Sequence, residues 1–289
     1  MSDYLIRGTA LQGKVRAFAV ITTAITEELR QRHGTSPTAT AALGRTAAAG
    51  LMIGAMLKGK EKLTIQVKGG GPIGQIVVDA NAVGEVRGYV DNPEVDLPLN
   101  SAGKLDVAGA VGTEGFIYMI KDLGMKEAYS GSVPIISGEL AEDFTYYFAK
   151  SEQTPSAVAL GVLVDTDYTV KVSGGFIIQL LPGLADAEIS AIELELSRVT
   201  SITSLLETGS SLEQILRGIL PSLQVLEQTE VHFRCQCSRE RVEKTLLSLG
   251  KEELHEMMVE EGSAEVVCHF CNEAYQFDQE GLQRMIESL

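Results

Sequence analysis

The chain has 289 residues, of which 45% are hydrophobic and 22% are charged. This composition is typical of a folded globular protein and excludes an intrinsically disordered chain. The formal net charge of −15 disfavours a protein whose main task is to bind a phosphate backbone, so we expect no nucleic-acid partner. The length allows one large domain or two smaller ones.

The apolar segments predict a cytoplasmic protein with no membrane partner. The N-terminal stretch lacks the apolar core of a signal peptide. The longest apolar run, Ala47–Leu57, is too short to span a bilayer. Because thiols are usually kept reduced in the cytosol, structural disulfides are the less favoured state of the four cysteines.

The chain opens with helical patterns. Residues 14–34 predict a helix that ends at Gly34, and its apolar side chains share one face: Phe18, Ile21, Ile25 and Leu29. Ser36 suits the N-cap of a second helix, because Pro37 then occupies the first helical turn. The many Ala and Gly residues that follow indicate close helix packing.

Strand patterns and one further helix complete the first region. Residues 62–90 alternate β-branched runs with Gly-rich turns, which predicts an antiparallel meander. Residues 138–153 are helical in pattern, and residues 156–183 return to strands that turn around Asp165–Asp167. We therefore predict an α+β fold for residues 1–183, a domain of helices and antiparallel sheet.

Composition changes after the "LPG" at residues 181–183. From Asp186 to about Leu220 the pattern is helical, and we predict a helical linker over residues 184–230. Five apolar side chains follow a spacing of three and four: Ile189, Ile192, Leu196, Val199 and Ile202. This face belongs either to an ordinary packed helix pair or to a surface that is covered in one state and exposed in another.

Residues 231–289 predict a small third domain. A strand-like "VHFRC" precedes a helix capped by Ser238, a second helix, a hairpin in "AEVVCHFCNEAYQF" and a short closing helix. Large apolar residues are few for this length. Such a domain needs a stabilising cross-link in addition to its hydrophobic core.

All four cysteines lie in this last segment. The pattern Cys235-x-Cys237, 30 intervening residues, then Cys268-x-x-Cys271 is the layout of a tetrahedral zinc site. In a regular strand, the Cβ atoms of a C-x-C pair lie roughly 7 Å apart. A Zn–S₄ site needs sulfurs about 3.8 Å apart, given Zn–S distances of about 2.3 Å. The chain is therefore expected to bend at Gln236.

The cysteine pattern leaves other uses open. An iron–sulfur cluster, two permanent disulfides or four inert thiols would also accommodate it. The nearby histidines, His232, His255 and His269, are not needed as ligands because four cysteines complete the set. Arg234, Arg239 and Arg241 form either a solvated face or a partial balance for the charge of four thiolates around one Zn²⁺.

The same site allows two roles. Bound zinc can hold a small domain folded. Because oxidised thiolates lose their metal, the site can equally be a redox switch, and spacing alone does not distinguish the two roles.

No catalytic set is evident, and we expect a protein that is not an enzyme. Neither G-x-S-x-G nor H-E-x-x-H occurs. "KGGGPIGQ" lacks the ending of a phosphate-binding loop and predicts a hairpin turn. Two other functions stay open: a thiol–disulfide oxidoreductase that uses the C-x-x-C pair, and a constitutive zinc adaptor.

Several segments together resemble one family. Besides the cysteine pattern, these are "YFAKSEQTPS" at Tyr147–Ser156, "SGGFIIQLLPG" at Ser173–Gly183 and "DYLIRG" near the start. With this combination the chain resembles the heat shock protein 33 family, the redox-regulated bacterial chaperones, over essentially its whole length.

The resemblance implies a mechanism. In the reduced state the four cysteines would hold one Zn²⁺ per chain and the chaperone would be inactive. Oxidation would pair Cys235 with Cys237 and Cys268 with Cys271, release zinc, unfold the C-terminal domain and destabilise the linker. The apolar surface so exposed would bind unfolded or oxidatively damaged client proteins without ATP, as part of a stress response. Active family members are homodimers.

Overall fold

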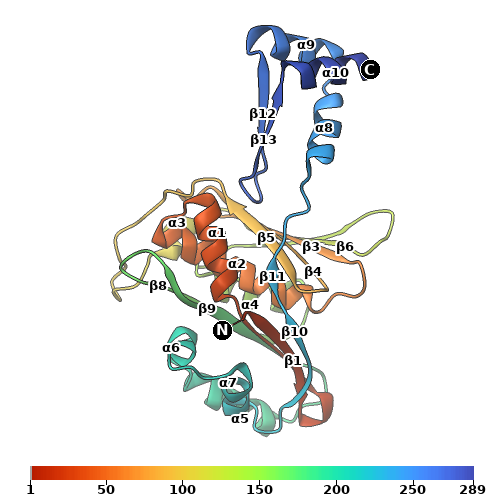
Figure 1. The fold of residues 1–289 in the computed structure, drawn as a ribbon. Coiled ribbons are helices and arrows are strands. Elements are labelled where there is room, and N and C mark those ends of the chain that lie inside the picture. Colours follow the sequence, from red (N-terminus) through yellow and green to blue (C-terminus); the bar gives the residue numbers. More distant parts are fainter. Residues whose placement is uncertain (1) are drawn as a thin grey trace. The chain divides into compact units, whose positions relative to one another are not determined.

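The computed structural model describes residues 2–289 and divides into two compact units. The first unit ends at Arg234, and the second is Cys235–Leu289. Both contain helices and antiparallel strands (Figure 1), which confirms the predicted α+β class. Among the described residues, no helix combines the length and apolar character needed to cross a bilayer.

The first unit contains two sheets and seven α-helices. Its helices are α1 (Thr23–His33), α2 (Pro37–Gly54), α3 (Val107–Val111), α4 (Leu140–Lys150), α5 (Asp186–Ser197), α6 (Ile202–Glu207) and α7 (Leu212–Ile219). Its strands are β1 (Tyr4–Ala10), β2 (Val15–Ile21), β3 (Lys62–Lys68), β4 (Gln75–Asn81), β5 (Glu85–Val90), β6 (Phe116–Asp122), β7 (Tyr129–Pro134), β8 (Ser156–Val164), β9 (Val170–Leu180), β10 (Gln224–Glu230) and β11 (His232–Phe233). A 3₁₀ turn, η1 (Leu11–Gly13), joins β1 to β2.

We call the two sheets the first sheet and the second sheet. The first has the order β10-β1-β2-β9-β8 and the second the order β11-β5-β4-β3-β6-β7. All their strand pairs are antiparallel except the short parallel pairing of β11 with β5. The meander over β3, β4 and β5 and the β8–β9 hairpin confirm the predictions for these segments.

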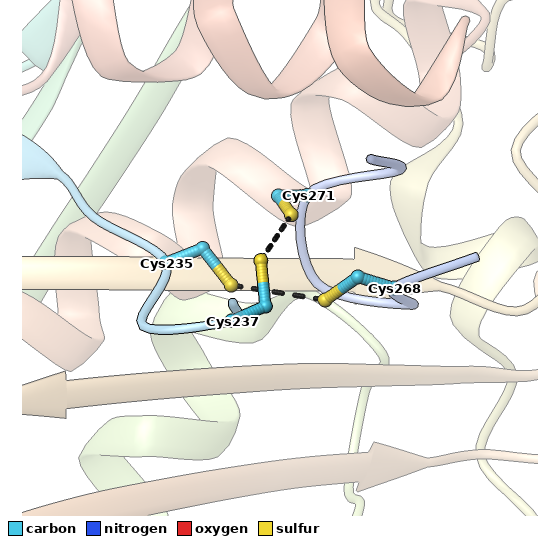
Figure 2. A group of neighbouring side chains, drawn as sticks. All are labelled: Cys235, Cys237, Cys268 and Cys271. Carbon is cyan, nitrogen blue, oxygen red and sulfur yellow. Dashed lines mark hydrogen bonds between the residues drawn. The ribbon is translucent and has the colours of Figure 1, made fainter. Parts of the chain in front are cut away.

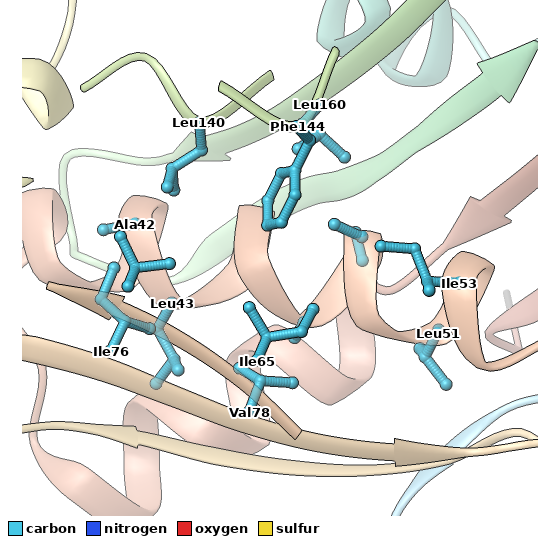
Figure 3. Packing of buried hydrophobic residues seen from close by; sticks show 14 of the residues in the cluster. Ala42, Leu43, Leu51, Ile53, Ile65, Ile76, Val78, Leu140, Phe144 and Leu160 are labelled. Atoms are coloured by element: carbon cyan, nitrogen blue, oxygen red, sulfur yellow. The ribbon is translucent and has the colours of Figure 1, made fainter. Parts of the chain in front are cut away.

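Helix α2 is the centre of the main core. Ser36 caps it by accepting the backbone N–H of Ala39, and Pro37 stands at the first helical position, as the sequence predicts. Sixteen of its residues are buried, because it lies among the two sheets and α4 (Figure 3). A helix that is apolar all round belongs in such a position.

Helices α5, α6 and α7 cover the other face of the first sheet (Figure 1). Phe18, Val20 and Ile177 of this sheet belong to the main core around α2. Phe176 and Ile178 point the other way, into a second apolar cluster made with α5–α7. The first sheet is therefore buried on both faces, and one of its two covers consists of the predicted linker helices.

Two segments differ from the sequence predictions. Residues 15–21 form β2, so the expected helix over 14–34 is wrong in its first half, although α1 does end at Gly34 with φ 62°. A central strand buried on both faces has apolar residues at nearly every position, which removes the strand alternation. Residues 224–230, expected within the helical linker, form β10 and pair with β1.

The second unit is small. It contains α8 (Arg239–Leu247), α9 (Lys251–Glu260), the hairpin of β12 (Ser263–Val267) and β13 (Ala274–Asp278), and α10 (Gln279–Ser288). Its core holds seven buried residues, namely Leu246, Leu254, Ala264, Phe277, Leu282, Met285 and Ile286. The expected order of helix, helix, hairpin and helix is confirmed.

We expect Gly175→Ala to destabilise the first unit by about 2 kcal/mol, because a Cβ there would lie 2.3 Å from the carbonyl oxygen of Ala159 on β8. Gly218→Ala is the matched control: Gly218 lies in α7, and apart from the adjoining residues and the backbone of that helix, no atom lies within 4 Å of its added Cβ. That change should raise stability by about 0.5–1 kcal/mol. Thermal unfolding of both variants measures the difference. Equal midpoints would contradict the packing of β8 on β9.

Candidate metal centre

The four cysteines of the second unit converge on one point. Their Sγ atoms all lie within 4.8 Å of one another, although Cys235 and Cys237 precede α8 whereas Cys268 and Cys271 lie in the turn between β12 and β13. Figure 2 shows the side chains of the two segments pointing toward one another. Three of the cysteines are half-buried and Cys271 is buried.

The sulfur spacing fits a tetrahedral S₄ ion site. The Sγ atoms of Cys235 and Cys268 are 3.7 Å apart, and those of Cys237 and Cys271 are 3.3 Å apart. A tetrahedron with metal–sulfur bonds of about 2.3 Å has edges of about 3.8 Å. A disulfide bond would need about 2.05 Å, and the structure records all four residues as thiols. The donor set is one that thiophilic cations such as Zn²⁺ prefer.

The first cysteine pair lies on a bend, as the sequence predicts. Residues 234–238 form neither strand nor helix. Arg241 of α8 donates to the carbonyl oxygen of Gln236, the residue between the two cysteines, at 2.8 Å. Ser238 then caps α8 by accepting the N–H of Arg241 at 3.3 Å. The start of α8 therefore holds the bend that brings Cys235 and Cys237 together.

The second pair lies on a hydrogen-bonded turn. The N–H groups of Cys271 and Asn272 both donate to the carbonyl oxygen of Cys268, at 3.3 and 2.8 Å. The N–H of Cys268 donates to the carbonyl oxygen of Glu273 at 2.9 Å. Asn272 takes a left-handed conformation, with φ 58°, which Asn adopts more readily than most residues. The turn presents both sulfurs on one side.

Two side chains connect α8 and the hairpin around the cluster. The hydroxyl of Tyr275 on β13 donates to Cys237 Sγ at 3.2 Å. The guanidinium of Arg239 donates to the carbonyl oxygen of Gln276 at 2.9 Å and lies 4.3 Å from the centre of the Phe277 ring. Sequence reasoning missed Tyr275. The only indication of Tyr275 in the sequence is a tyrosine in a predicted strand, shortly after the second cysteine pair.

Without a cation the cluster favours the protonated thiols. Burial raises the pKa of Cys268 and of Cys271, against the opposing effect of backbone N–H groups that donate to their sulfurs. A bound divalent cation would reverse this preference, because it stabilises thiolates directly. The four sulfurs therefore form a site that stays together best with an ion at its centre.

The remaining residues predicted near the site lie outside the sulfur cluster. His232, His255 and His269 are exposed, and none belongs to the group of possible ligands. Arg234 belongs to the first unit and pairs with Glu85 at 3.3 Å. Arg239 and Arg241 support the chain around the cysteines through backbone contacts.

The predicted apolar face of the linker is covered in this structure. Ile192 and Ile202 are buried, and Leu196 and Val199 are partly buried against the cluster on the first sheet. Ile189 is half-buried on α5. Beside them, residues including Leu11, Ala191, Leu194 and Pro221 line a groove of about 430 Å³.

Comparison with known proteins decides the family. The model of the Hsp33 protein family matches residues 3–278. The chain belongs to the Hsp33 family. It is 55% identical over 282 residues to the 33 kDa chaperonin of Bacillus subtilis (strain 168), covering 97% of each chain. It is 54% identical over 291 residues to that of Bacillus cereus (strain B4264), covering all of both.

A solved structure agrees over the full length. The crystal structure of the 33 kDa chaperonin of Thermotoga maritima matches with a TM-score of 0.94 and 39% identity, covering 100% of this chain and 99% of that one. Membership of the Hsp33 family supports a chaperone function for this chain.

We expect the affinity of the cluster for Zn²⁺ to fall as the pH falls. Metal binding displaces protons from thiols, two of which have a raised pKa, so acid favours the metal-free form. Between pH 7.5 and 5.5 the affinity should drop about 100-fold or more. Competition with a chelator of known affinity measures it. Cys268→Ser should bind more weakly throughout and with a shallower slope; a pH-independent affinity would contradict a thiolate site.

Proposed function

We propose that this protein is a redox-regulated, ATP-independent holdase chaperone. One observation carries the proposal: four thiols converge in a unit whose own core has only seven buried residues. Such a unit depends on what its sulfurs bind. Its folded state is then sensitive to any oxidant that changes the sulfurs.

In the reduced state, Cys235, Cys237, Cys268 and Cys271 hold one Zn²⁺ per chain. The ion supplies charge balance for the four thiolates and a cross-link between the two cysteine segments. Structural zinc contributes about 10–16 kcal/mol of apparent binding free energy, which exceeds the stability of most domains. The small unit therefore stays folded while its cysteines stay reduced.

Oxidation joins Cys235 to Cys237 and Cys268 to Cys271. In each reaction two thiolates lose two electrons to one peroxide molecule, which takes up two protons and leaves as two waters. In the folded unit, two close sulfur contacts run across the pairs, from Cys235 to Cys268 and from Cys237 to Cys271. Once the unit unfolds, however, closing a C-x-C or C-x-x-C loop costs far less entropy than closing a loop of more than 30 residues.

Unfolding of the second unit reaches the linker through residues 224–234, which we call the strap. The strap runs along both sheets as β10 and β11 and leads directly into Cys235. Besides the pairing of β10 with β1, its end contacts the first unit at two places: the N–H of Val231 donates to the carbonyl oxygen of Asp3, and Arg32 lies 4.6 Å from the centre of the Phe233 ring. Loss of the strap would leave α5–α7 held by their apolar face and by a few polar contacts, such as the ion pair of Lys171 with Glu207.

Release of α5–α7 exposes client-binding surface. Two surfaces then become available to unfolded or oxidatively damaged proteins. One is the face of the first sheet beneath the linker. The other is the apolar face of the linker, formed by Ile189, Ile192, Leu196, Val199 and Ile202. We place the protein in the cytoplasm and expect a homodimer in the active state. The domains in this scheme are residues 1–183, 184–230 and 231–289.

The geometry disfavours the alternative of a thiol–disulfide oxidoreductase. Cys268 and Cys271 lie in a hairpin turn between β12 and β13 rather than at the start of a helix, where a positive helix end would activate the first thiol. Absence of insulin reduction by the reduced protein, at concentrations where thioredoxin is active, is the expected result.

We expect the reduced protein to carry one zinc per chain and to lose it on oxidation. Peroxide at elevated temperature, or hypochlorite, should release the metal, form the two local disulfides and produce a form that suppresses aggregation of a denaturing test enzyme. Zinc is measured with a chromogenic chelator, disulfides by peptide mapping and aggregation by light scattering. An oxidised, zinc-free form that leaves aggregation unchanged would refute the holdase function.

We expect Ile192→Ser to give partial holdase activity without oxidant. Ile192 is 4% exposed and is the one buried residue of α5, so the change should weaken the cover by about 2–4 kcal/mol. Leu194→Ser, at a position 54% exposed on the same helix, is the matched control and should stay inactive when reduced. Amide exchange shows whether α5 detaches. A detached α5 without holdase activity would contradict the proposed client surface.

A further inference from the structure

We propose that the first sheet, once uncovered, prefers client segments in which acidic residues flank apolar ones. This inference rests on the proposed function and names the class of client segment that fits the same surface. The observation behind it concerns the covering elements, α5–α7 and β10. Three of these four elements are tied to the sheet by an ion pair, and in each pair the covering element supplies the carboxylate.

Two of the pairs stand at opposite ends of the first sheet. Lys14, just before β2, has its Nζ atom 3.7 Å from a carboxylate oxygen of Glu188 on α5. Lys171, near the start of β9, has its Nζ atom 3.0 Å from a carboxylate oxygen of Glu207 on α6. Because β2 begins beside the end of the antiparallel strand β9, the two lysines lie far apart along the sheet.

The third pair stands at the edge of the sheet. Arg7 on β1 lies 3.0 Å from Glu227 on β10, and the two residues are direct neighbours across the strands. Each of the three cations is also adjacent in sequence to an apolar residue that belongs to, or packs against, the cluster beneath α5–α7. These neighbours are Ile6, Val15 and Val172. The cations therefore border the apolar surface that the covering elements occupy.

The covering segment shows what kind of occupant this surface accepts. Residues 184–230 hold eight acidic and two basic side chains, and their apolar side chains fill the cluster on the sheet. Release of the segment would remove the carboxylates that now face Arg7, Lys14 and Lys171, and Lys171 would keep only Asp165, at 3.9 Å. A client segment in the same place meets an apolar surface bordered by three cations, so acidic residues beside its apolar ones raise its affinity.

The net charge of the whole chain would give the reverse preference. A formal charge of −15 attracts basic segments from a distance. The three cations act within roughly a Debye length, about 8 Å at physiological salt, and thus only on a segment that has already reached the surface. A preference for acidic segments therefore reports the local cations rather than the overall charge.

The test uses the oxidised, zinc-free, full-length protein and two fluorescently labelled peptides that share one apolar core. One peptide carries glutamates on both sides of the core, and the other carries lysines. At low salt we expect the glutamate peptide to bind about 3- to 30-fold more tightly, as three exposed ion pairs allow. At high salt the difference should shrink to about 2-fold or less. Fluorescence anisotropy measures both affinities.

Variants locate the source of the preference. Lys14→Gln with Lys171→Gln should abolish it. Lys60→Gln with Lys126→Gln removes the same charge from two exposed lysines, in the loop before β3 and in the turn between β6 and β7, and should keep it. Lys171→Glu with Glu207→Lys preserves an ion pair in the reduced protein but leaves a carboxylate on the uncovered sheet. This reversed pair should stay inactive when reduced and, once oxidised, favour glutamate less than wild type does.

Equal binding of the two peptides at low salt, or tighter binding of the lysine peptide, would overturn the inference. A glutamate preference that survives in the Lys14→Gln, Lys171→Gln variant would overturn it as well, because the preference would then come from elsewhere. If the oxidised wild type binds neither peptide and leaves a denaturing test enzyme to aggregate, the proposed function fails too. Suppressed aggregation without a glutamate preference would refute the inference alone.

Discussion

The convergence of four sulfur atoms is the interaction on which the second unit depends. Seven buried residues form its core, and the sulfurs of two distant segments meet beside that core within 4.8 Å. As thiols they contribute little cohesion, and burial of Cys268 and Cys271 opposes their ionisation. With a divalent cation the same atoms become the strongest contacts in the unit. Under the proposed function, the stability of this unit is therefore conditional on chemistry that oxidants change.

The first unit differs in what stabilises it, because its main core consists of packed side chains and does not depend on the state of the cysteines. Helix α2 buries sixteen residues between two sheets. The cover on the other face of the first sheet is weaker: α5 buries Ile192 alone, α6 buries Ile202 and Leu206, and α7 buries four residues. Since a buried aliphatic side chain contributes about 1.5–3 kcal/mol, α5 and α6 can detach at a cost far below that of unfolding α2.

The sequence predicted the clustering of the four cysteines better than it predicted the sheet order. Ligand chemistry restricts cysteines to short local spacings. A pattern such as Cys268-x-x-Cys271 can therefore be recognised as a possible metal site without knowledge of the fold. The caps at Ser36 and Ser238 are equally local and were predicted for the same reason. The strands β2 and β10 were not: β2 is buried on nearly every residue and so lacks the strand alternation, and β10 pairs with the distant β1, as Glu230 does with Tyr4.

Tyr275 shows the same limit within the site itself. Its hydroxyl meets a sulfur 38 residues earlier in the chain. That contact depends on the register of β12 and β13 and on the bend held by Arg241. Neither a propensity nor a spacing rule contains this information. The cysteines of the site can thus be identified from the sequence, whereas a group that contacts one of their sulfurs becomes visible only in three dimensions.

The strap explains why a change at the cysteines can affect helices that lie earlier in the chain. Residues 224–230 pair with β1, residues 232–233 pair with β5, and Cys235 follows after Arg234 alone. The ion pair of Arg234 with Glu85 involves an arginine side chain that is 62% exposed, and such pairs contribute about 0–1 kcal/mol. Val231 and Phe233, which pack against the main core, are the other anchors of this end of the strap. In the proposed function, unfolding of the second unit would remove the folded neighbour of the strap's end, and fraying would proceed from Cys235 toward β10. Since β10 is the next element after α7 in the chain, its loss would free α5–α7 before the fraying reached the core around α2.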